Sequence, residues 1–256
     1  MGMLYSLGNY INSNTLSSVS SEEDIYPKEN MYNKRQSMPW RMIAKSGHAI
    51  WDLGDDRPMC IGIMNHNLVG SGAFSLTLSC DDDPPGWNGQ AWGPTSIPYH
   101  AQNIFYIIPT AERNRRWWRL DVSDPDNGAN LEFGEIVLYD YGAFTRNYSY
   151  PYEEGLDYVV DESVTQYGHR HRAKKAKRKT FALDFEGVKD ALLVSEVQAF
   201  FEGLDGKDPF IFIPDDAGAD SWYVYCLNSM KASRVFLDYN KFSLALEEQS
   251  RGISLL

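Results

Sequence analysis

The chain of 256 residues has no long apolar run, no metal-type cysteine spacing and no catalytic signature. No apolar stretch approaches the roughly 18 residues of a membrane span, so we expect no membrane insertion. Residues 1–21 lack the basic start and apolar centre of a secretory signal, which predicts folding in a cytoplasm. Neither a nucleophile elbow, an HExxH sequence nor a phosphate-binding loop is present. These absences predict a protein that is not an enzyme and that uses no cofactor.

Cysteine is scarce, with only three residues, Cys60, Cys80 and Cys226. No CxxC pair and no Cys/His ligand spacing occurs, so buried reduced thiols are expected. A Cys60–Cys80 disulfide is the alternative if the protein ends up outside a cell. The acids at Asp81–Asp83 and at Asp124 and Asp126 could offer oxygen atoms to calcium, but they do not follow EF-hand spacing and are ordinary turn residues. We therefore predict no metal site.

What the chain does contain is aromatic and apolar residues, 43% of the total, with 12 Phe, 16 Tyr and 7 Trp. Ile50–Leu68 reads as strand, polar turn, strand and Asn/His turn, in which His66 is expected to serve turn hydrogen bonding. Short alternating segments separated by Gly, Pro, Asn and Asp predict a β-sandwich or jelly roll. The expected strands are Ala49–Leu53, Met59–Asn65, Ala73–Ser79, Asn103–Pro109, Trp117–Ser123 and Glu132–Tyr139.

A second pattern begins after an irregular connector at 142–168. Thr180–Phe185 alternates as a strand should, and Asp190–Leu204 places its apolar residues on one helical face, with Asp190 as a candidate cap. Further strands are expected at Pro209–Pro214, Trp222–Leu227 and Lys241–Glu247. The fold class is thus mainly β: an N-terminal arm at 1–38, a jelly-roll β-sandwich at 39–141, and a smaller α+β assembly domain at 142–256 with one amphipathic helix.

Charge is unevenly distributed along the chain. The net charge is −11, yet the segment 168–179 holds seven of the 24 Lys and Arg residues and no acid. The remainder then has 17 basic against 35 acidic residues, a net of −18. We interpret 168–179 as a loop that contacts an acidic subunit or partner; a solvated loop and a nucleic-acid site are the alternatives. Its candidate contact residues are Arg170, Arg172, Lys174, Lys175, Lys177, Arg178 and Lys179.

The segment Pro84–His100 holds aromatic residues among Gly, Asn and Gln. Exposed aromatic rings beside amides suit sugar stacking, so Trp87, Trp92 and Tyr99 are candidate glycan-binding residues. Packing or a subunit interface is the alternative. Trp117, Trp118, Phe200 and Phe201 are expected in cores, because Trp118 lies on the apolar side of its strand and both phenylalanines lie on the apolar face of their helix.

The order of several motifs resembles the structural proteins of the distal tail, or tail tip, of long-tailed bacteriophages, which carry a discoidin-like jelly roll. The motifs are Ala49–Gly54, Asn65–Leu68, Arg116–Asp121, Leu131–Leu138 and Pro209–Asp215. The resemblance implies a homo-oligomeric ring in the tail of the virion, between the tail tube and the adsorption apparatus. The implied partners are copies of itself, the tube and the tail hub or tip proteins, without nucleic acid. The alternative is a carbohydrate-binding, lectin-like module that contacts a glycan on the host surface.

Overall fold

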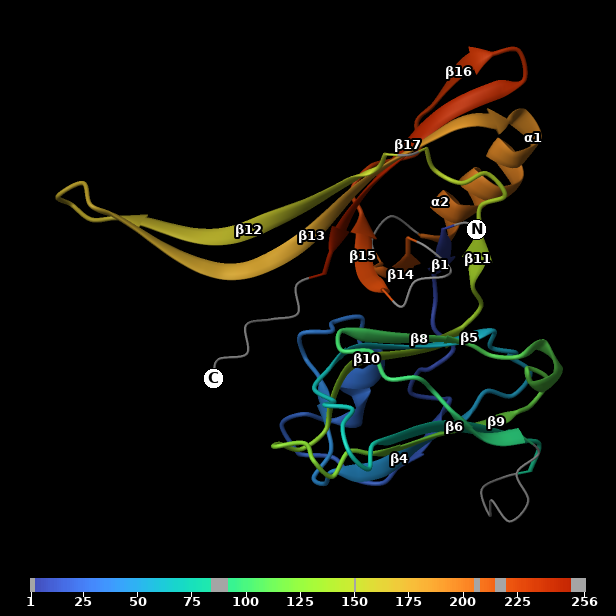
Figure 1. The fold of residues 1–256 in the computed structure, drawn as a ribbon, viewed down its shortest axis with the longest axis vertical. Helices are drawn as coiled ribbons and strands as arrows, with labels where there is room; N and C mark the ends of the chain where they lie inside the picture. The colour runs from blue at the N-terminus through green and yellow to red at the C-terminus, as the bar shows by residue number, and fades with distance from the viewer. Residues whose placement is uncertain (1–2, 84–91, 150, 205–207, 215–219, 250–256) are drawn as a thin grey trace.

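The computed structural model describes residues 3–83, 92–149, 151–204, 208–214 and 220–249. These form a β-sandwich and, stacked against it, a second unit of eight strands and one helix (Figure 1). A two-stranded hairpin projects far beyond the second unit. Within the described residues, no helix combines the length and the apolar character needed to cross a membrane.

The sandwich consists of two antiparallel sheets. Its core includes Trp51, Trp118 and Phe133, all fully buried, and the alternation of Trp118, Leu120 and Val122 places one side of β9 inside. The mainly β fold with a sandwich is therefore confirmed. One sheet has the order β3 (Trp40–Arg41), β10 (Glu132–Tyr139), β5 (Cys60–His66), β8 (Asn103–Ile107). The other has the order β2 (Leu16–Val19), β4 (Ser46–Asp52), β9 (Trp117–Ser123), β6 (Ser75–Asp81), β7 (Trp92–Ser96).

The second unit is built on one antiparallel sheet. Its order is β11 (Gly142–Ala143), β1 (Leu4–Ser6), β14 (Phe210–Ile213), β15 (Trp222–Cys226), β17 (Tyr239–Glu248), β13 (Arg170–Lys189), β12 (Glu153–Val164), with β16 (Ala232–Phe236) beside β17. The predicted strands at 180–185, 209–214, 222–227 and 241–247 all fall within this sheet. Short 3-10 turns occur at η1 (Lys28–Tyr32) and η2 (Thr110–Glu112).

The predicted helix is confirmed. It runs through α1 (Asp190–Leu192), a π-type segment η3 (Leu193–Gln198) and α2 (Ala199–Gly203). Val197 and Phe200 are buried against the sheet, as the apolar face predicted. The expected capping role of Asp190 is wrong, because its carboxylate does not bond the helix start. It accepts hydrogen bonds from Asn240 and, at 3.0 Å, from Arg234.

The expected N-terminal arm at 1–38 is also wrong. Residues 4–6 form β1, which pairs with β14 on one side and β11 on the other. Residues 16–19 form β2, which pairs with β4 in the sandwich. Residues 4–6 pair with the edge of β14, which satisfies their backbone groups, and residues 16–19 pair with β4. The N-terminal segment therefore contributes one strand to each unit.

Apolar side chains join the two units. Met64 and Val137, on the outer face of the sandwich, pack with Ile211, Ile213 and Tyr223 of the second unit. Polar contacts flank this cluster: Asn103 donates to the Ser221 carbonyl at 2.6 Å, and the Gln36 backbone donates to Gln249 at 2.9 Å.

All three cysteines are free thiols, with Cys60 and Cys80 buried in different sheets of the sandwich. Burial raises the pKa of each of these two thiols to about 12. The predicted turn bond of His66 is confirmed, since the Leu68 backbone donates to its Nδ1 at 3.3 Å.

Candidate assembly surface

The most prominent surface is the projecting hairpin, which we define as residues 153–179. It comprises β12, a turn at 165–169 and the first half of β13, paired from Leu156 with Lys179 to Val164 with Arg170 (Figure 1). The connector at 142–168 and the loop at 168–179 were expected to be irregular, and both expectations are wrong for these strands. Both faces of the hairpin meet solvent, so no core selects a buried face of its strands.

One face of the hairpin carries exposed apolar side chains. Residues directly opposite in an antiparallel pair share a face, so these side chains lie beside cations of β13. Tyr158 lies opposite Lys177, and Val160 lies opposite Lys174, whose ammonium is 4.6 Å from the centre of the Tyr158 ring. The exposed fractions are 44% for Leu156, 49% for Tyr158, 44% for Val160 and 60% for Val164.

The seven predicted contact residues lie together in one half-strand, yet most of them already have partners in the chain. Arg170 and Arg172 pair with Glu162 at 3.4 and 3.0 Å, and Lys175 pairs with Asp161 at 2.6 Å. Nearer the base, Arg178 pairs with Glu247 at 2.6 Å and Lys179 pairs with Glu154 at 3.1 Å. The segment therefore presents less free positive charge than its sequence suggests, which leaves little for phosphate binding.

Both long edges of the hairpin are open within the described residues. β12 is the last strand of its sheet, and the pairing of β13 with β17 starts only at Thr180. The two edges differ in charge. β12 has five acids and no base, whereas 170–179 has seven bases and no acid. Unpaired edges of this length are templates for pairing with another chain.

Of the three predicted glycan residues, Trp92 and Tyr99 pack against other aromatic side chains of the sandwich. Trp87 lies outside the described residues. Trp92 belongs to β7 and meets the buried Trp118 edge to face, with 6.2 Å between ring centres. Tyr99 packs on Phe74 at 5.5 Å and donates its hydroxyl to the Leu68 carbonyl at 3.1 Å. Trp92 and Tyr99 therefore fit the alternative prediction, a packing role, better than glycan binding.

The prediction that Trp117 lies in a core is wrong, because it lies on the outer face of the five-stranded sheet. Trp117 alternates with the buried Trp118, and the Arg116 guanidinium lies 5.6 Å from its ring centre. Asp52 accepts two hydrogen bonds from that guanidinium, each 2.7 Å long. Within the described residues, Trp117 Nε1 and Ser79 Oγ have no hydrogen-bond partner. The alternation in Trp117–Ser123 could have shown that Trp117 faces outward.

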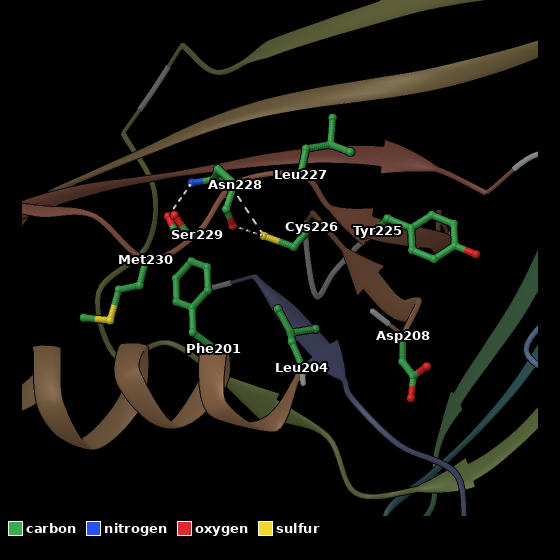
Figure 2. A pocket seen from close by; sticks show the side chains of 9 residues that line it. All are labelled: Phe201, Leu204, Asp208, Tyr225, Cys226, Leu227, Asn228, Ser229 and Met230. Carbon is green, nitrogen blue, oxygen red and sulfur yellow. Dashed lines mark hydrogen bonds between the residues drawn. The ribbon is translucent and has the colours of Figure 1, made fainter. Parts of the chain in front are cut away.

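A cavity of about 340 Å³ lies between α2 and the end of β15 (Figure 2). Most of its wall is apolar, with Phe201, Leu204 and Met230 around the Cys226 thiol. That thiol lies 3.3 Å from the Asn228 carbonyl, and burial raises its pKa, which disfavours the nucleophilic thiolate. In the part of the chain that the structure describes, no three His, Cys, Asp or Glu residues gather to hold a metal.

No protein-family model matches the chain, and no curated protein matches it either. Solved structures are similar to about half of it. One is CpGH89CBM32-6 of Clostridium perfringens, 16% identical, covering 51% of this chain and 98% of that chain, with a TM-score of 0.38. Chitosan-binding module 1 of a Paenibacillus sp. IK-5 chitosanase/glucanase is 13% identical, with coverages of 52% and 98% and a TM-score of 0.36.

A GH29 fucosidase of Ruminococcus gnavus, in complex with fucose, is 16% identical. The likeness covers 52% of this chain and 27% of the fucosidase, with a TM-score of 0.41. These scores are low, so the β-sandwich assignment rests on the two sheets themselves.

Proposed function

We propose that this protein is a structural subunit that assembles with copies of itself through the projecting hairpin. The carrying observation is that the hairpin has one acidic and one basic open edge. A two-stranded ribbon alone is marginally stable in water, and a third and fourth strand stabilise it. A neighbouring hairpin supplies those strands.

The charges select how the edges pair. Two β12 edges side by side would place acid against acid, and two basic β13 edges would place base against base, both of which are destabilising. Only β12 of one copy beside β13 of the next brings opposite charges together. With hairpins oriented alike, that pairing is antiparallel, as within each hairpin. Such a head-to-tail contact uses two different surfaces, so it closes into a ring or continues as a filament.

At a finer level, we propose a place in the tail of a tailed-phage virion, as a ring between the tail tube and the adsorption apparatus. This step rests on the motif resemblance. The sandwich would then be a peripheral platform, and the neighbours of the ring would be tube and tail hub or tip proteins. Assembly would take place in the cytoplasm of the host bacterium.

Charge exchange between the two edges tests the assembly proposal. We expect Lys174→Glu with Lys175→Glu and Lys177→Glu to give monomers in light scattering, because the middle of the basic edge becomes acidic and then meets the acids of β12. Asp157→Lys with Asp161→Lys and Glu162→Lys makes both edges basic and should also give monomers. An equal mixture of the two variants should assemble again, since each acidic edge meets a basic one.

A matched control changes three exposed lysines away from the hairpin: Lys45→Glu, Lys189→Glu and Lys231→Glu. It alters the net charge equally and should leave assembly unchanged. A wild-type protein that stays monomeric, or a mixture of edge variants that does not assemble, contradicts the proposal. Negative-stain microscopy of the assembled protein tests whether the product is a closed ring.

Glycan recognition by the sandwich is the second candidate function. The observation that favours it is the Trp117 face, where an aromatic ring lies beside the Arg116–Asp52 pair. Sugars stack on aromatic faces and bond to charged planar groups. Fucose and chitosan oligosaccharides, named in the compared structures, serve as probes in calorimetry. Trp117→Ala should abolish binding and Trp92→Phe should preserve it; an unchanged affinity of Trp117→Ala would exclude this face.

A further inference from the structure

A buried carboxyl group lies where the sandwich meets the second unit. Glu135 is on β10, two residues before Val137, which packs against Ile211 and Tyr223 of the second unit. Residues two apart on a strand share a face, so Glu135 faces the same contact. Only 1% of its surface is exposed.

The carboxyl group is only partly satisfied. Its Oε2 accepts a hydrogen bond from the Lys34 backbone at 2.9 Å, while Oε1 has no partner within the described residues. A buried charge without full hydrogen bonding is costly, and such a group takes up a proton instead. Burial accordingly raises the pKa of Glu135 well above its usual value, against the lowering effects of the Lys34 backbone hydrogen bond, the nearby Asn9 side chain and the Lys34 charge.

The groups around Glu135 come from both units. On the sandwich side are Lys34, Asn9 and the cross-strand neighbour Met64. On the other side is the buried Tyr223, whose pKa is raised by its own burial and then by the charges of Glu135, Tyr225 and Asp208. Lys34 does not supply a free countercharge, since its ammonium pairs with Asp208 across the same boundary.

We propose that Glu135 is a proton-dependent latch between the sandwich and the eight-stranded sheet. With its carboxyl group protonated, the two units stay packed. Loss of that proton places an uncompensated charge against Tyr223 and the apolar cluster of Met64 and Val137, and the contact loosens. A change in pH would therefore free the sandwich from the unit that carries the projecting hairpin.

The direction of the pH effect follows from linkage. The packed state holds the proton more tightly than the open state, so the stabilisation is complete below the usual carboxyl pKa. It is lost as the pH rises through the raised pKa of buried Glu135.

Hydrogen exchange tests the latch in the full-length protein. We expect peptides covering β10, β14 and β15 to lose protection as the pH is raised stepwise above the usual carboxyl pKa, after correction for intrinsic rates, by roughly tenfold for each unit of pKa shift. Glu135→Gln cannot ionise and should keep its protection across this range. The strands β4, β6 and β9, far from the boundary, should stay protected in both proteins.

Two further variants make the outcome decisive. Glu132→Gln alters a carboxyl group on the same strand that pairs with Arg41 inside the sandwich unit, and it should retain the wild-type pH response. Glu135→Leu replaces the ionisable group by an apolar side chain. It should lose the pH dependence of protection even if the side-chain amide of Glu135→Gln packs poorly. Wild-type protection that does not change with pH overturns the latch. An equal loss of protection in Glu135→Gln and Glu135→Leu also overturns it.

Discussion

The two halves of β13 have opposite surroundings although they form one continuous strand. In the half from Thr180 to Lys189, Phe181, Leu183 and Phe185 are buried, and the strand pairs with β17 along most of this length and with β12 as well at residues 180–182. In the half from Arg170 to Lys179, the strand has β12 on one side and no partner on the other within the described residues. One half belongs to a hydrophobic core, and the other extends into solvent (Figure 1).

The difference shows where each half obtains its stability. The buried half gains from apolar area removed from water, about 25 cal/mol per Å². The exposed half relies mainly on the backbone bonds to β12 and on surface ion pairs, which individually contribute little. A monomer thus holds the hairpin weakly, while a neighbour that adds strands at its edges would stabilise it.

The largest effect is expected where the strand enters the core. Phe185 is fully buried and stacks on Phe242, with 4.4 Å between ring centres and 6° between planes. Phe185→Ala should lower the free energy of unfolding by about 3–5 kcal/mol, because it removes these contacts and leaves a cavity. Urea unfolding followed by fluorescence measures this loss. In the exposed half, Tyr158→Ala should stay within about 0.5 kcal/mol of wild type; similar losses in both variants would contradict the comparison.

The buried parts of the fold could be predicted from the sequence. The strands Trp117–Ser123 and Glu132–Tyr139 match their expected bounds. Trp117–Ser123 alternates because one of its sides meets the core, and Glu132–Tyr139 forms an almost continuous buried run. The single helix was predictable for the same reason, with a period of 3.6 residues. Where one face of an element packs against a core, the spacing of its apolar residues predicts that element.

The projecting hairpin could not be predicted in this way. β12 and the first half of β13 have no buried face, so charge and tyrosine content resembled a connector and a loop. The candidate contact residues were found through charge alone, and their ion pairs depend on a register that the sequence does not reveal. Trp92 was expected in an exposed loop because glycine and proline lie next to it in the sequence, whereas the structure places it in β7.

A moderate effect is expected on removing the exposed half altogether. Replacing residues 157–178 by Asn-Gly joins Leu156 to Lys179, which are opposite one another, through a two-residue turn that suits hairpins. The free energy of unfolding should change by less than about 1 kcal/mol, because no core side chain is lost. Light scattering should then show a monomer. A shortened chain that still assembles like the wild type would show that the hairpin is not the contact.

The smallest effect is expected from a single ion pair of the hairpin. Arg172→Ala removes the 3.0 Å contact with Glu162, which keeps its second partner Arg170. Exposed pairs of this kind contribute about 0–1 kcal/mol, so thermal unfolding of the monomer should hardly change. Assembly should weaken more than stability, and its dependence on salt should decrease, because Arg172 also lies on the basic edge. Sedimentation velocity at low and high salt measures both. If Arg172→Ala instead lowered monomer stability by more than about 2 kcal/mol, the exposed half would belong to the core as firmly as the Phe185 half does.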